Sequence, residues 1–179
     1  MSQLEDILRY NEKFVQNGDF RPYEAPSRPI KKMTIVSCMD CRLIELLPKA
    51  MNVKNGDAII LKSAGGMVES PYSNIMKSIL VSLYELGSRA VYIIGHTDCG
   101  MHGLHATKMI EDIKKTGIDE HKFASVQINL NQWLNGFQSV EDEVRKSVSI
   151  VSTHPLLPDN TPVIGLVIDP KTGELTPVD

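Results

Sequence analysis

The chain has few cysteines, no excess of basic residues and no long hydrophobic run. Three cysteines among 179 residues are odd in number, so we expect a protein of the reducing cytoplasm without a disulfide framework. The longest apolar run, at 163–168, is far shorter than the roughly 20 residues that cross a membrane. A net charge of −3 and a pI near 6.0 predict no surface for nucleic acid. The acidic first residues, MSQLEDILRYNEKF, are not typical of a signal peptide.

The hydrophobic content of 42% is sufficient for one domain with a substantial core, which we expect to span residues 1–179. Within it, residues 1–29 are predicted to form an N-terminal helix and a Pro-rich connector. Apolar residues recur at helical spacing in this helix, predicted at 3–17: Leu4, Ile7, Leu8, Phe14 and Val15. Because the helix precedes the first strand and has no place in the core, we expect its apolar stripe to pack on a partner subunit.

Strands alternate with helices in the rest of the chain. Apolar and β-branched runs predict strands at 33–37, 57–63, 90–95 and 163–168, of which the first is buried. The spacing of apolar residues and the capping signals predict helices at 42–51, broken near Pro48; from Ser70 and Pro71 to Gly87; at 103–115; and from Ser139, with Asp142 in a capping box. This alternation predicts an α/β fold, in which a parallel sheet carries helices on both faces.

The ends of two predicted strands carry side chains that bind metals. Cys38 follows the first strand in SCMDCRL, and His96 and Cys99 follow the third strand in GHTDCGM. In open α/β sheets the carboxyl ends of the strands form the ligand-binding edge, so two thiols and an imidazole can converge there. Two cysteines and one histidine form a known catalytic zinc set, with a fourth position left open.

Other chemistry of these residues stays open at this point. Cys38 and Cys41 form a C-x-x-C pair that could act as the redox dithiol of a thiol–disulfide oxidoreductase. A zinc-stabilised binding module without catalysis is also possible, if Asp40 permanently occupies the fourth metal position. The segment SAGGMVES, from residue 63, lacks the G-K-[ST] of a P-loop, and it predicts a tight turn that brings backbone close to a small ligand.

Taken together, the motifs SCMDCRL, KSAGG and GHTDCGM resemble those of the β-class carbonic anhydrases, and the short length resembles their small bacterial and archaeal members. The motifs lie within residues 30–105, and the order of strands and helices fits most of the chain. The resemblance implies a mainly parallel sheet with an added antiparallel edge strand, which the segment GELTPV could supply. It also implies a homodimer or a higher homo-oligomer.

The resemblance further implies the reaction, a zinc-dependent, reversible hydration of carbon dioxide to bicarbonate and a proton. It implies one zinc ion per chain, and it assigns the site residues as follows: metal ligands Cys38, His96 and Cys99; a catalytic dyad of Asp40 and Arg42; and backbone near Gly65 and Gly66 lining the substrate pocket. Related family members hydrolyse carbonyl sulfide or carbon disulfide with the same zinc chemistry, so these substrates stay open.

Two residues depart from the pattern of the family. Cys41 stands where the family often has a small residue, and Ser63 stands where it commonly has asparagine. Neither departure removes a predicted ligand, but both could change the access of substrate or the sensitivity of the site to oxidation.

Overall fold

A single five-stranded sheet organises the computed structural model, which describes residues 2–179 except for the side chain of Glu120. In spatial order its strands are β2 (Ala58–Ser63), β1 (Met33–Cys38), β3 (Ala90–His96), β4 (Val163–Ile168) and β5 (Leu175–Val178). All neighbours pair in parallel except β4 and β5, which pair antiparallel. The predicted α/β fold is therefore confirmed, and the GELTPV segment does supply the antiparallel edge strand.

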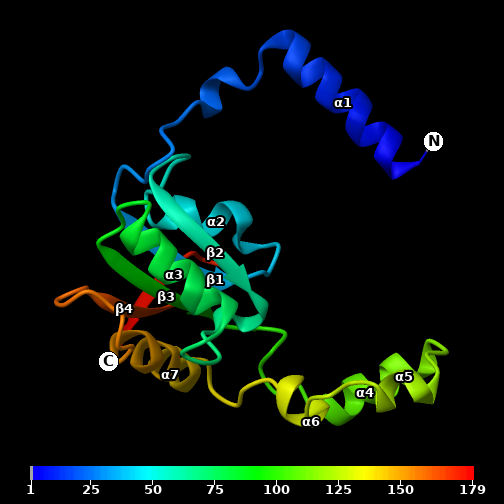
Figure 1. The fold of residues 1–179 in the computed structure, drawn as a ribbon. Coiled ribbons are helices and arrows are strands. Elements are labelled where there is room, and N and C mark those ends of the chain that lie inside the picture. The colour runs from blue at the N-terminus through cyan, green and yellow to red at the C-terminus, as the bar shows by residue number, and fades with distance from the viewer. Residues whose placement is uncertain (1) are drawn as a thin grey trace.

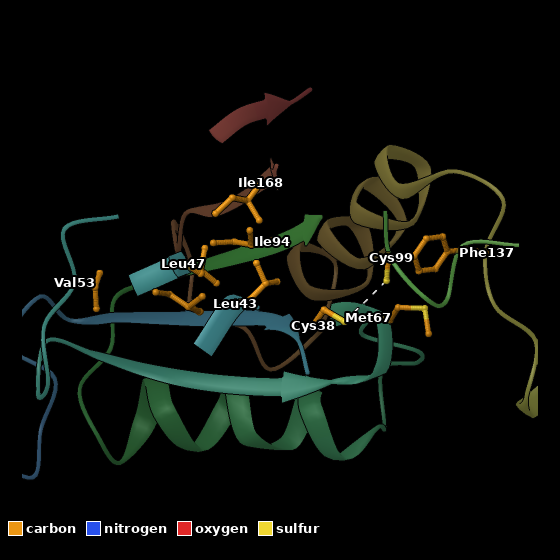
Figure 2. Packing of buried hydrophobic residues seen from close by; sticks show 10 residues of the cluster. Cys38, Leu43, Leu47, Val53, Met67, Ile94, Cys99, Phe137 and Ile168 are labelled. Carbon is orange, nitrogen blue, oxygen red and sulfur yellow. Dashed lines mark hydrogen bonds between the residues drawn. The ribbon is translucent and has the colours of Figure 1, made fainter. Parts of the chain in front are cut away.

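Helices cover both faces of this sheet, as predicted (Figure 1). In chain order they are α1 (Gln3–Asn17), α2 (Leu43–Ala50), α3 (Asn74–Tyr84), α4 (Ala106–Lys115), α5 (Glu120–Ala124), α6 (Leu130–Trp133) and α7 (Val140–Ser152). The helices α3 and α7 pack on one face, against a cluster that includes Val36 and Ile93. On the other face, Leu43 and Leu47 of α2 pack near Ile94 and Ile168 (Figure 2). Among residues 2–179, every helix is too short or too polar to cross a bilayer.

The predicted start of α3 was wrong by several residues. The helix begins at Asn74, and its N-cap is Ser73, whose side chain accepts a hydrogen bond from the Met76 N–H at 3.2 Å. Ser70 and Pro71 instead lie in a turn, in which the Ser73 N–H donates to the Ser70 carbonyl oxygen at 3.2 Å. Proline suits the second position of a turn as well as the first position of a helix, so the Ser-Pro signal did not distinguish the two.

Two further helix boundaries differ from the prediction. The helix α4 starts at Ala106 instead of residue 103, because Gly103 adopts a left-handed φ of 69° and donates to the Phe137 carbonyl oxygen at 2.8 Å. The helix α2 is not broken at Pro48 and continues to Ala50. Since Pro48 lies in the last turn, its missing N–H removes only one late hydrogen bond of the helix.

Two segments extend away from the sheet. In Figure 1, α1 stands apart at the end of the connector, and α4, α5 and α6 lie together beyond another edge of the body. The predicted helix at 3–17 is confirmed, with Ser2 as its N-cap in a capping box and Gly18 as its C-cap. None of its residues is buried, and Phe14 alone of the apolar stripe is half-buried, with its ring 6.3 Å from that of Tyr23.

Candidate metal centre

The pairing of β1 with β3 brings the predicted metal ligands to one edge of the sheet. Ser37 of β1 pairs with Ile94 of β3, so Cys38 and His96, the last residues of their strands, lie at the same edge of the sheet, one residue out of line. Cys99 follows three residues after His96. All three side chains are buried, and their potential ligand atoms lie within 4.8 Å of one another. The two sulfurs are 3.9 Å apart (Figure 2).

The His96 ring is arranged to use one nitrogen as a metal ligand. Its Nδ1 lies 2.8 Å from the Thr97 carbonyl oxygen, an arrangement in which Nδ1–H donates and Nε2 keeps its lone pair. Within residues 2–179, Nε2 is the one buried side-chain nitrogen or oxygen without a hydrogen-bond partner. Buried polar atoms rarely remain unpaired, and a cation beside the two sulfurs would give this atom its partner. The donor set therefore fits a metal ion.

The two buried thiols hold negative charge at this position. The Cys99 thiol, whose sulfur is 3.9 Å from that of Cys38, lowers the pKa of Cys38 by hydrogen bonding, although burial opposes this shift. The hydrogen bond to Cys38, together with burial, raises the pKa of the Cys99 thiol. A soft cation such as Zn²⁺ would replace the proton between the two sulfurs.

A carboxylate held by a guanidinium lies beside the three ligand atoms. Arg42 Nη2 donates to Asp40 Oδ2 at 2.7 Å, and Arg42 Nε lies 3.1 and 3.2 Å from the two carboxylate oxygens. The Arg42 backbone N–H also donates to Asp40 Oδ1 at 2.8 Å. These bonds lower the pKa of Asp40 to about 2, so the group is ionised at neutral pH. Its Oδ2 is 3.9 Å from His96 Nε2, close to the position that a metal would take.

The glycines of the tight turn pack directly against this edge. They lie in the 3₁₀ turn η2 (Ala64–Gly66) after β2, and both have left-handed φ angles, 72° at Gly65 and 70° at Gly66. A Cβ at Gly66 would lie 2.8 Å from the Cys38 backbone nitrogen, so only glycine fits without a shift. The turn therefore packs its backbone directly against Cys38 at the end of β1. Whether the two glycines also line the substrate pocket stays a prediction.

Sequence reasoning missed two residues that support the site. Asp98 binds Arg42, accepting from Nη1 through its carboxylate at 2.8 Å and from Nη2 through its carbonyl oxygen at 2.9 Å. Lys62 donates to the Cys38 carbonyl oxygen at 3.1 Å. The available signal for Asp98 was a second carboxylate placed between the two ligands of the GHTDC motif.

Cys41 lies outside the cluster of buried ligands. Its side chain is exposed, whereas Cys38 and Cys99 are buried. We therefore expect Cys41→Ala to keep zinc near one ion per chain and most of the activity, as measured by metal analysis and turnover of the purified variant. If this substitution alone removed the metal, the assignment of the three ligands would be wrong.

Comparisons with known proteins agree with this geometry. The sequence model of the carbonic anhydrase family matches residues 33–175. The chain is 49% identical to the Bacillus subtilis protein YtiB over 178 residues, covering 98% of this chain and 95% of that protein. It is 29% identical to β-carbonic anhydrase 1 of Mycobacterium tuberculosis, covering 99% of each. The crystal structure of β-carbonic anhydrase isoform I from Trichomonas vaginalis superposes with a TM-score of 0.90 at 35% identity, covering 99% of this chain and 98% of that one.

Proposed function

The chain belongs to the β-class carbonic anhydrases and hydrates carbon dioxide reversibly to bicarbonate and a proton; we propose that it does so at a zinc ion held by Cys38, His96 and Cys99. The observation that carries this proposal is the unpaired, buried Nε2 of His96 beside two sulfurs. Zinc, when bound, supplies a Lewis acid that allows water to lose a proton near neutral pH. The two thiolates balance its charge, and the bond from Nδ1 to Thr97 orients the imidazole.

Asp40 is the group that can orient the attacking water. Its carboxylate is ionised and can only accept hydrogen bonds, so it takes the hydrogen of the water and directs an oxygen lone pair toward carbon. Arg42 donates to both oxygens of this carboxylate, which opposes a rotation of Asp40 onto the metal. This arrangement favours an open fourth position, and hence catalysis, over a zinc-stabilised module whose fourth ligand is Asp40.

The burial of the thiols argues against the redox alternative. A disulfide between Cys38 and Cys41 would need the buried Cys38 sulfur, which lies beside Cys99, to turn toward an exposed residue. The free thiols of the site must also stay reduced to bind a metal. We therefore place the protein in a reducing compartment, the cytoplasm.

The choice of substrate can be tested on one zinc-loaded preparation. Turnover would be measured with carbon dioxide by stopped flow, and with carbonyl sulfide and carbon disulfide by release of hydrogen sulfide. We expect carbon dioxide to give the highest kcat/KM. A preparation that hydrolysed either sulfur compound with a higher kcat/KM than it hydrates carbon dioxide would overturn this choice of substrate.

We also propose that residues 1–179 form one domain, in which residues 1–29 are an N-terminal arm. Within this arm, α1 packs on a second copy of the chain. Leu4, Ile7, Leu8 and Val15 of its apolar stripe are exposed, and burial of such a stripe is what stabilises an amphipathic helix in water. Deletion of residues 1–20 should therefore weaken assembly, measured as a fall in mass by light scattering over a dilution series.

Point variants of α1 separate its apolar stripe from its polar face. Leu8→Glu places a charge on the stripe and should weaken assembly like the deletion. Lys13→Glu changes charge on the opposite face of the same helix and should leave the mass unchanged. A truncated protein with the mass and thermal stability of the full chain would refute this role of α1.

A further inference from the structure

Arg42 binds a second carboxylate besides that of Asp40, and this second partner comes from the other strand end. All three guanidinium nitrogens are engaged: Nε and Nη2 contact Asp40, while Nη1 donates to Asp98 Oδ2 at 2.8 Å. Nη2 also donates to the Asp98 carbonyl oxygen at 2.9 Å. Asp98 lies in the segment between His96 and Cys99. Arg42 therefore connects the loop after β1 with the loop after β3.

The backbone of Asp98 is shaped for this contact. Its φ is 54°, a left-handed conformation that non-glycine residues rarely adopt and that aspartate and asparagine tolerate best. In this conformation the carbonyl oxygen and the carboxylate of one residue reach the same guanidinium. The left-handed backbone of Asp98 thus coincides with two hydrogen bonds that it accepts from Arg42.

Stability alone does not account for this ion pair. The Asp98 side chain is 70% exposed, and exposed ion pairs contribute little to the free energy of unfolding. The geometry has a clearer consequence. A guanidinium is a rigid planar fork, so fixing its Nη1 end on Asp98 also fixes the edge, formed by Nε and Nη2, that it presents to Asp40.

We propose that Asp98 is a positioning residue for carbon dioxide hydration, which holds Arg42 in the plane that orients the Asp40 carboxylate. The proposal rests on the function proposed above. Asp98 is outside the cluster of metal-ligand atoms, and in this proposal it acts through its bonds to Arg42. Without Asp98, the guanidinium can rotate, and its hydrogen bonds to Asp40 weaken.

Two variants at residue 98 test this role while keeping the left-handed backbone. Asp98→Gly removes the side chain, and we expect zinc to stay near one ion per chain while kcat falls about three- to tenfold. Asp98→Asn keeps an oxygen that can still accept from Nη1, so it should restore part of the loss. Matched controls are Asn160→Gly, at another exposed residue with a φ of 62°, and Asp112→Asn, in an exposed ion pair with Lys115 of the same 2.8 Å length.

A second readout does not depend on turnover. The Arg42 Nε–H contacts Asp40 and not Asp98, so its hydrogen exchange reports whether Asp98 supports the Asp40–Arg42 pair. Its signal in ¹H–¹⁵N spectra of the zinc-loaded protein is identified by its loss in Arg42→Lys. We expect exchange to be at least about tenfold faster in Asp98→Gly, intermediate in Asp98→Asn and unchanged in both controls.

Wild-type exchange in Asp98→Gly would overturn the proposal, and so would faster exchange with wild-type turnover. If Asp98→Gly did not fold, Asp98→Asn would have to exchange faster than the wild type for the proposal to stand. If the zinc-loaded wild-type protein did not hydrate carbon dioxide, the proposed function would be refuted. The exchange measurement does not depend on turnover, so it would still show whether Asp98 positions Arg42.

Discussion

Replacing Cys99 by serine should remove zinc and abolish carbon dioxide hydration. A serine hydroxyl does not ionise near neutral pH and is a harder donor than a thiolate, so the site loses both a ligand and a negative charge. Removing a hydrogen-bond partner of a metal ligand lowers metal affinity about 10- to 100-fold. Removing the ligand itself should lower the zinc affinity by more than this. Competition with a chelator of known affinity measures it, and turnover is measured on the same samples.

The matched control for this prediction is Cys41→Ser, the same chemical change at the exposed cysteine. It should keep zinc near one ion per chain. Cys38→Ser should behave like Cys99→Ser, because the two sulfurs are buried 3.9 Å apart and share the predicted metal position. A Cys99→Ser protein with full zinc content would show that the metal lies elsewhere.

The second large effect should come from the Asp40–Arg42 pair. Arg42→Ala and Arg42→Lys should both retain zinc but lose at least about tenfold in turnover, which corresponds to roughly 1.4 kcal/mol of barrier. Lysine is a poor substitute because it offers a point charge in place of the planar fork that contacts both Asp40 oxygens. Asp40→Asn should fall further, since an amide has only one accepting oxygen to serve both Arg42 and the water.

The opposing expectation for Arg42 is that of an ordinary surface charge. In that case Arg42→Ala would change the free energy of unfolding by less than about 1 kcal/mol and leave turnover intact. Full zinc occupancy with wild-type turnover in Arg42→Ala would therefore exclude the dyad from the mechanism. Stopped-flow kinetics and metal analysis of the same preparation separate these outcomes.

The sequence predicted that Cys38, His96 and Cys99 meet at one edge of the sheet, because this meeting depends on short, local patterns. The apolar runs at β1 and β3 end at Cys38 and His96, and parallel neighbours necessarily place such ends together. The start of α3 was missed because Ser70 and Pro71 fit a turn as well as a helix. Periodicity does not decide between these two uses of the same dipeptide.

The contact between Arg42 and Asp98 was beyond sequence reasoning for a different reason. The two residues are 56 positions apart, and they meet where the loops after β1 and β3 lie together and Asp98 has a left-handed backbone. The close packing of the η2 turn on Cys38 has a similar reason, since the turn has two consecutive left-handed glycines. Residue types indicated a tight turn there, but they did not indicate which strand end the turn would pack against.

The most direct test of the zinc mechanism is one titration. The metal is removed from the purified wild-type protein with a chelator, zinc is returned in measured steps, and carbon dioxide hydration is followed by stopped flow at each step. We predict negligible turnover without zinc and a linear rise that ends at one zinc ion per chain. Full turnover in the zinc-free protein would contradict a catalytic zinc ion bound by Cys38, His96 and Cys99. Binding of one zinc ion per chain without any turnover would contradict it as well.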